Sequence, residues 1–144
     1  MQTTSVERQD GDGRATAEMS LLSAISNEMV RLYKEQFGRG PTKVRTHWAG
    51  PDIVLVALED TLTPAERNLV KMDEHQRLRD LRLYFQYATV REFCEPIERL
   101  TQRKVRSFHS SIDTEANGMA LEVFVLHPAG YDGASRTDHA EPSR

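Results

Sequence analysis

Cysteine is nearly absent from this sequence, and its scarcity excludes several classes of protein. Cys94 is the only cysteine among 144 residues, so an internal disulfide framework is excluded and a reducing compartment is indicated. The chain also lacks the run of about 18 apolar residues that a membrane-spanning helix needs. Its first residues show no basic segment followed by an apolar run, so we expect no signal peptide and a cytoplasmic location.

A surplus of positive charge is missing as well. The formal net charge is −3. This charge falls on residues 1–19 and 128–144, so the segment between them is neutral. Proteins that bind nucleic acid independently of sequence usually carry a strong basic surplus. The charge balance therefore argues against that mode of binding.

Motifs for catalysis and for cofactors are also missing. The glycines of segment 38–43 follow a predicted helix and precede a predicted strand, the reverse of a phosphate-binding loop. No Gly-x-Ser-x-Gly elbow is present, and the five histidines lack the spacing of a zinc site. Cys94 lies beside Phe93 in a predicted helix, which indicates a buried, inert thiol. We predict a protein that is not an enzyme and that holds no metal or cofactor.

What the sequence does contain is an internal similarity. Residues 24–60 run through a helical apolar pattern, a basic alternating segment and an apolar run, and residues 88–127 repeat that order. We predict two α-β-β repeats, at about residues 18–60 and 84–127, joined by a linking helix at residues 63–83. Together they form one domain over residues 18–127.

The polar ends of the chain show no apolar period. Residues 1–17 and 128–144 are therefore predicted to be disordered tails.

Local signals predict where the elements begin and end. Gly38 stands where a helix over residues 18–37 needs a left-handed C-cap. Thr63 and Glu66 flank Pro64 as a capping box. We expect the long helical pattern that follows to break at residues 71–74, with Pro96 as a further kink.

These elements predict an α+β fold with a four-stranded antiparallel sheet and helices packed on one face. The strand at residues 53–58 is apolar on both sides, so the other sheet face also needs cover. A second copy of the chain, giving a homodimer, is the simplest cover. The alternative is that the helix from Pro64 to about Lys71 folds over this face.

The two basic segments supply the candidate ligand- or partner-binding side chains, which are Lys43, Arg45, His47, Lys104, Arg106 and His109. If a two-fold relates the repeats, these side chains cluster across the sheet as an anion-binding surface. The alternative is an exposed face on which they pair with Glu59, Glu122 or Asp113. His47 and His109 hold nearly matching repeat positions, which would let them approach each other, but two histidines without a third ligand do not predict a metal.

Aromatic residues follow the predicted linking helix. Tyr84, Phe85 and Tyr87 come after the arginines at positions 77, 79 and 82, a composition that base stacking would use. Their helical spacing is more typical of core residues, and neighbouring carboxylates offset the arginines. We predict that they belong to the core.

Three phrases, taken together, resemble the MpsC-type domain family. They are KEQFGRGP at Lys34–Pro41, LTPAE at Leu62–Glu66 and ERLTQRKV at Glu98–Val105. The resemblance covers about residues 20–127. Gln102 stands where the pattern has glycine, which weakens the expectation of a left-handed turn there.

The family is named for the accessory third component of a sodium-translocating, membrane-potential-generating system also linked to inorganic-carbon uptake. The resemblance therefore implies a non-enzymatic accessory or regulatory domain that docks on a membrane transport partner or senses a small anion. It is compatible with a position at the inner face of the membrane, without insertion. The alternative function is a nucleic-acid-binding regulator that uses a basic sheet face, and an enzyme built on His47 and His109 ranks last.

Overall fold

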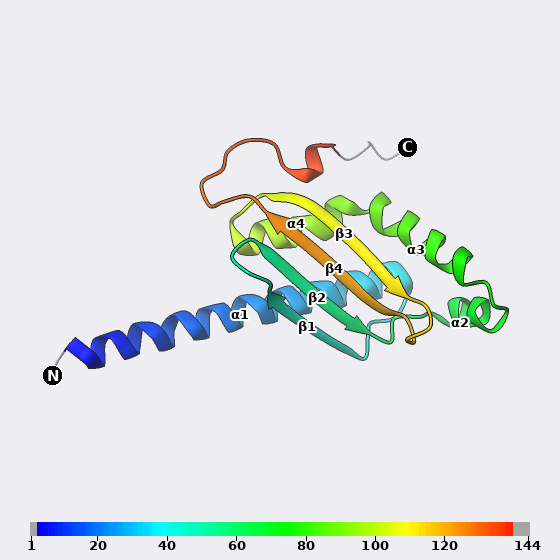
Figure 1. The fold of residues 1–144 in the computed structure, drawn as a ribbon, viewed down its shortest axis with the longest axis horizontal. Coiled ribbons are helices and arrows are strands. Elements are labelled where there is room, and N and C mark those ends of the chain that lie inside the picture. Colours follow the sequence, from blue (N-terminus) through cyan, green and yellow to red (C-terminus); the bar gives the residue numbers. More distant parts are fainter. Residues whose placement is uncertain (1–2, 140–144) are drawn as a thin grey trace.

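The computed structural model describes the backbone of residues 3–139 and the side chains of residues 13–139. Its elements follow the chain in this order: α1 (Thr3–Phe37), β1 (Lys43–Trp48), β2 (Ile53–Glu59), α2 (Pro64–Lys71), α3 (His75–Ala88), α4 (Val90–Thr101), β3 (Val105–Asp113), β4 (Met119–Leu126) and the short 3-10 helix η1 (Arg136–His139). Figure 1 shows how they are arranged.

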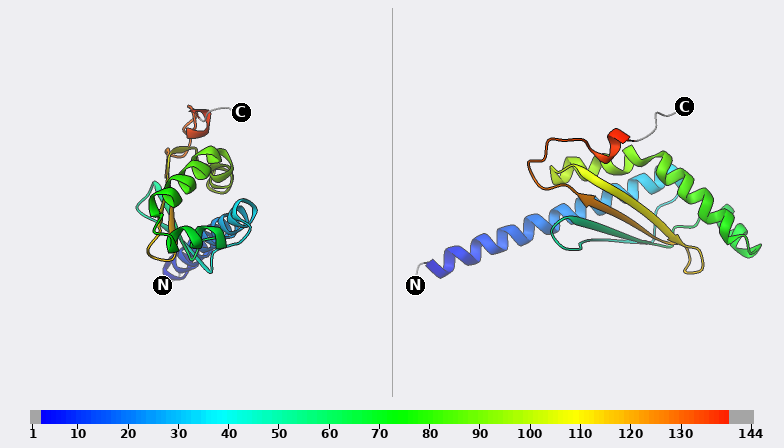
Figure 2. Two further views of the ribbon diagram at one scale, coloured as in Figure 1. Left: turned by 90° about the vertical axis from the view of Figure 1, so that its right-hand side faces the viewer. Right: turned by 45° about the horizontal axis from the view of Figure 1, so that its top comes forward.

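The four strands form one antiparallel sheet in the order β1-β2-β4-β3. The helices lie on one face of this sheet, and the opposite face is left open (Figures 1 and 2). The predicted α+β fold is therefore confirmed. The internal repeat stays a prediction, although the helix-strand-strand order of α1-β1-β2 recurs in α4-β3-β4.

Left-handed residues end both helices that precede an edge strand. Gly38 has φ +78°, and Gln102 has φ 57° and ψ 31°. Gln102 is held there because its side-chain amide donates to the carbonyl of Arg99 at 2.7 Å. The left-handed turn thus forms at Gln102 as well, although glycine is the residue that favours it.

The long helical pattern of the middle of the chain is divided twice. The predicted capping box is present, with Glu66 N–H donating to Thr63 Oγ1 at 3.2 Å and Thr63 N–H donating to Glu66 Oε1 at 2.8 Å. The predicted break falls between α2 and α3, where Asp73 has φ 57°. A second break at Thr89 was not predicted, and there the Thr89 hydroxyl donates to the carbonyl of Phe85 at 2.8 Å. Pro96 lies inside α4, which continues through it.

Alternation along the strands divides the side chains between the two faces of the sheet. The buried side is covered by α1 and α4, and its aromatic centre joins Phe93, Phe108 and Phe124. The partly exposed side chains of β2 and β4 point the other way. α2 packs against α3 at one end of the molecule, so it is not the cover of the open face that the alternative prediction required.

Both ends of the chain differ from the predicted tails. α1 begins at Thr3, and its side chains from Gly13 to Ser20 are exposed where the helix projects past the sheet (Figure 1). At the other end, the segment after β4 folds back toward α4, and buried Ser135 donates to Glu98 Oε2 at 2.7 Å. Composition missed this contact because one buried serine leaves no apolar pattern. Residues 1–2 and 140–144 of the predicted tails lie outside the described residues.

Candidate functional site: an open sheet face, an apolar helix surface and a buried network

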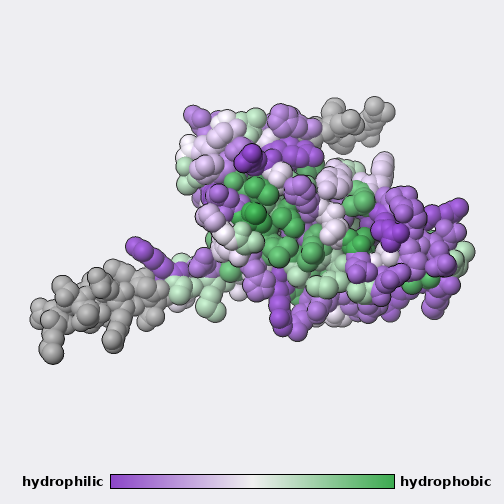
Figure 3. Space-filling view, in the orientation of Figure 1, coloured by the Kyte–Doolittle hydropathy of each residue, from purple (hydrophilic) through white to green (hydrophobic). Residues whose placement is uncertain are grey.

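The open face of the sheet carries an apolar centre, which we call the open-face patch. It consists of six partly exposed side chains from the two central strands: Ile53, Leu55, Ala57, Leu121, Val123 and Val125. Each β2 member lies opposite a β4 member in the register. Figure 3 shows hydrophobic residues gathered over this part of the molecule. The patch therefore forms one continuous apolar surface.

The candidate basic residues flank the patch at opposite edges. Lys43, Arg45 and His47 are exposed on β1, and His109 is exposed on β3. The register runs His47–Leu55–Val123–His109, so two strands separate the histidines. Three strand spacings amount to about 14 Å. His47 and His109 therefore do not approach each other.

The remaining basic candidates, from the second segment, do not join the β1 group. Lys104 Nζ donates to the carbonyl of Gly133 in the C-terminal segment. Arg106 lies at the irregularity between Val105 and Ser107, at the far edge of the sheet. The sheet order therefore divides the predicted basic cluster into two groups, because β1 and β3 are its outer strands.

Helix α3 presents apolar side chains to solvent. Tyr84 is 70% exposed, Phe85 46% and Leu81 43%, and the rings of Tyr84 and Phe85 meet edge-on at 5.9 Å between centroids. With exposed Ala88, they form what we call the α3 outer surface. The prediction that Tyr84, Phe85 and Tyr87 belong to the core is therefore wrong, because Tyr87 is also 40% exposed, although its ring contacts Phe108.

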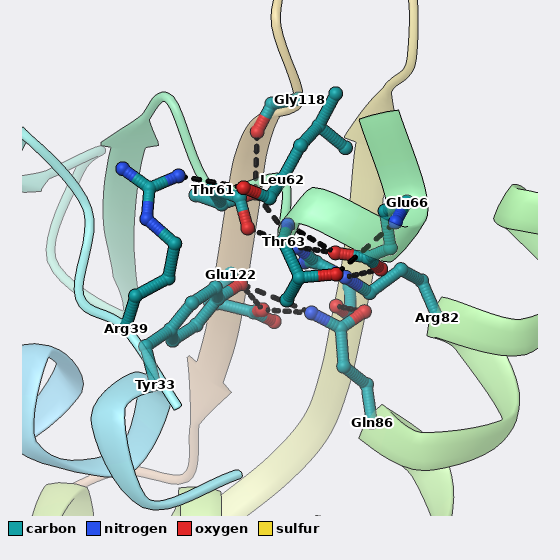
Figure 4. A network of polar contacts seen from close by, with 11 residues as sticks. Tyr33, Arg39, Thr61, Leu62, Thr63, Glu66, Arg82, Gln86, Gly118 and Glu122 are labelled. Carbon is teal, nitrogen blue, oxygen red and sulfur yellow. Dashed lines mark hydrogen bonds and ion pairs between the residues drawn. The ribbon is translucent and has the colours of Figure 1, made fainter. Parts of the chain in front are cut away.

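The inward face of α3 is polar instead. Arg82 is fully buried and donates from Nε to Glu66 Oε2 at 2.5 Å and from Nη2 to Thr61 Oγ1 at 3.1 Å (Figure 4). Its guanidinium carbon also lies 4.2 Å from the centroid of the Phe37 ring. The ion pair with Glu66 links α3 to α2, and the hydrogen bond to Thr61 links α3 to the loop after β2. Breaking a buried pair of this kind is strongly destabilising.

A second buried group continues this polar layer onto the sheet. Glu122 Oε1 accepts from Tyr33 Oη at 2.7 Å and from Gln86 Nε2 at 2.6 Å. Ser110 Oγ donates to Gln86 Oε1. Glu122 therefore links β4 to α1 and α3, and Gln86 extends the network to β3. The expectation that Glu122 pairs with a basic residue on the exposed face is wrong, because strand alternation directs it inward with Ala120 and Phe124.

Burial governs the protonation of this group. Burial raises the pKa of Glu122 from 4.5 to about 8, and hydrogen bonds from Tyr33 and Gln86 and the charge of Arg82 offset only part of that effect. Burial and the neighbouring carboxylate hold the pKa of Tyr33 well above its ordinary value. Near neutral pH, Glu122 is therefore mostly a neutral acid that accepts hydrogen bonds inside the core.

The family of this chain follows from its match to a known protein-family model. A family model described as "Na+-translocating membrane potential-generating system (MpsC)" matches residues 17–128. The chain belongs to the MpsC family. No curated protein and no solved structure matches it.

The match covers α1 from residue 17, α2–α4 and the whole sheet of this MpsC-family domain. None of the helices within residues 3–139 is long and apolar enough to cross a membrane. Among the same residues, no three His, Cys, Asp or Glu side chains are grouped so that they could hold a metal ion. Cys94 is buried, and burial raises the pKa of its thiol to about 12.

Sequence reasoning missed the polar layer of this MpsC-family domain. Its signals were present as charged and amide residues placed within apolar periods. Glu122 alternates with Ala120 and Phe124, and Arg82 and Gln86 follow buried Leu78 at four-residue steps. Residues so placed point toward the core.

Proposed function

We propose that this MpsC-family chain is a non-enzymatic accessory domain that binds a membrane-embedded subunit of a sodium-translocating, membrane-potential-generating system. Direct contact between the two proteins is the proposed mode of action. The α3 outer surface is the observation that carries this proposal. Its family supplies the class of partner.

The α3 outer surface has the composition of a protein-binding site. Tyrosine and phenylalanine are enriched in the centres of protein interfaces, where a ring buries a large area and loses little side-chain freedom. Tyr84 and Phe85 already contact one another through their rings. Their edge-on contact presents two adjacent apolar side chains of the kind that form binding hot spots.

The buried network explains why α3 turns this side outward. Arg82 and Gln86 take the inward positions and bond to Glu66 and Glu122. A helix anchored by buried polar contacts has a fixed rotation about its axis, because any rotation would leave those groups unpaired. The apolar side chains of α3 are thereby held in solvent in a defined orientation.

The transported species and the location complete the proposal. We place the domain in the cytoplasm, at the inner face of the membrane, beside a partner that moves cations and is linked to inorganic-carbon, including bicarbonate, uptake. The family description supports the sodium-dependent part. The runner-up function, a nucleic-acid-binding regulator, gains no support from the basic residues, because the sheet order divides them between two edges.

Affinity capture from native membranes tests this proposal. The tagged chain is compared with the Tyr84→Glu/Phe85→Glu variant after gentle solubilisation, and the bound chains are identified by mass spectrometry. Met19→Glu is the matched control, since Met19 is also an exposed apolar side chain, 69% exposed, on a different helix.

We expect the unaltered chain and the Met19→Glu control to recover an integral membrane subunit of a cation transporter, and the double variant to lose it. Equal recovery of the membrane subunit by all three chains would show that it does not bind to the α3 outer surface. Recovery of no membrane subunit by any chain would contradict the proposed function.

A further inference from the structure

We propose that the open face is the interface of a homodimer whose two-fold axis runs along the strands, between β2 and β4. This inference rests on the sheet alone and does not depend on the α3 outer surface. In this dimer, β2 of one copy lies over β4 of the other, and β1 lies over β3.

The need for cover comes from the central strands. β2 and β4 carry buried side chains toward the helices and the open-face patch toward solvent. Strands that are apolar on both sides are typical of sheets covered on both faces. Within the described part of the chain, all of the α-helices lie on one side of the sheet. A second copy brings an identical apolar surface to the uncovered side.

The distribution of charge selects the orientation of the two copies. The register groups the charges at one end of the face, where Lys43 lies opposite Glu59, and Asp113 lies opposite Met119. At the other end of the face the two central strands are apolar, with Ile53 opposite Val125.

A two-fold axis along the strands places the Lys43 corner over the partner copy's Asp113 corner, and apolar end over apolar end. An axis across the strands would instead press the charged end onto the apolar end. Burying charge without a partner is costly, so the axis along the strands is favoured.

The size of the face indicates how tight the dimer is. Four strands about 4.8 Å apart and four rows of outward side chains about 6.7 Å apart cover roughly 19 Å by 27 Å, or about 500 Å² on each copy. The total of about 1,000 Å² from the two copies is below the standard size of specific interfaces and is typical of transient ones. We therefore expect a reversible dimer whose population rises with concentration in the micromolar range.

Sedimentation of the full chain over a concentration series tests the oligomeric state. The unaltered chain is compared with Val123→Glu, at the centre of the open-face patch, and with Met19→Glu as the control outside it. Each two-fold interface would bury two new carboxylates, so Val123→Glu is expected to raise the dissociation constant about 100-fold or more, and Met19→Glu to leave it unchanged.

Cross-linking tests the orientation with substitutions that remove no apolar contact. In the proposed dimer, His47 of one copy faces the partner copy's His109, across the roughly 10 Å that separates packed sheets. His47→Cys/His109→Cys should therefore cross-link between copies with a bismaleimide of about that reach. Each single variant should not, because its two thiols lie at opposite edges. Cys94 stays out of the reaction, because it is buried and its thiol has a pKa of about 12.

Concentration-dependent dimers, weakened by Val123→Glu and cross-linked only in the double-cysteine variant, are the expected result. A chain that sediments as a monomer at every concentration overturns the inference, and so does a dimer that Val123→Glu leaves intact. Cross-linking by the single variants as efficient as by the double variant overturns the proposed axis. These outcomes do not depend on the affinity capture from native membranes, which tests the α3 outer surface.

Discussion

Protonation of Glu122 couples the stability of this domain to pH. The side chain is fully buried, and its pKa rises from 4.5 to about 8, mainly through burial. The informative perturbation is Glu122→Gln, which imitates the neutral acid. Both hydrogen bonds that Glu122 receives end on Oε1, and an amide oxygen in that place can still accept them.

The sign follows from comparing the folded and unfolded chains. Between pH 4.5 and about 8 the folded chain keeps the proton on Glu122, whereas the unfolded chain releases it. The folded state then binds more protons, so the free energy of unfolding falls as pH rises across this window, and it levels off above pH 8. One pH unit corresponds to about 1.4 kcal/mol, which gives a total loss of about 5 kcal/mol.

Urea denaturation at half-unit steps from pH 5 to pH 9 measures this effect. The unaltered chain should lose stability steadily toward pH 8, and Glu122→Gln should remove that component of the slope. Glu115→Gln is the control, because it makes the same chemical change at an exposed position of the β3–β4 turn. Parallel pH profiles for the unaltered chain and Glu122→Gln would refute the reasoning.

Two further substitutions test other parts of the buried layer. Arg82→Met should cost about 3 kcal/mol in the free energy of unfolding because it leaves the Glu66 carboxylate buried without its ion pair, and adding Glu66→Gln should restore more than half. An equal loss in the single and double variants would contradict that coupling. Gly118→Ala should cost about 2 kcal/mol more than Gly130→Ala, measured by thermal and urea denaturation. Both glycines have positive φ, but only at Gly118 would the new Cβ lie 2.5 Å from Leu62, so equal losses would exclude the steric contribution.

Local rules predicted much of the fold. Gly38, the Thr63–Glu66 capping box and the apolar strand at residues 53–58 depend on neighbouring residues and backbone geometry, and the structure confirms each. The features of the fold that local rules did not predict depend on the order and register of the strands. The sheet order β1-β2-β4-β3 places the two basic segments at opposite edges, and no local pattern contains that information.

The polar layer was not predictable in the same way. A buried carboxylate depends on partners far along the chain, and Tyr33, Gln86 and Glu122 come from three different elements. The α3 helix was read with the wrong side inward because an apolar stripe usually faces the core. Here the buried Arg82 ion pair determines which side faces inward.

The most direct test of the proposed function measures membrane potential in cells that lack this chain. A potential-sensitive dye reports the sodium-dependent component after complementation with the unaltered chain, Met19→Glu or Tyr84→Glu/Phe85→Glu, each expressed at equal level. The proposal predicts that the first two restore this component and the α3 variant does not. A membrane potential that is the same with and without the chain, or full restoration by the α3 variant, would contradict it.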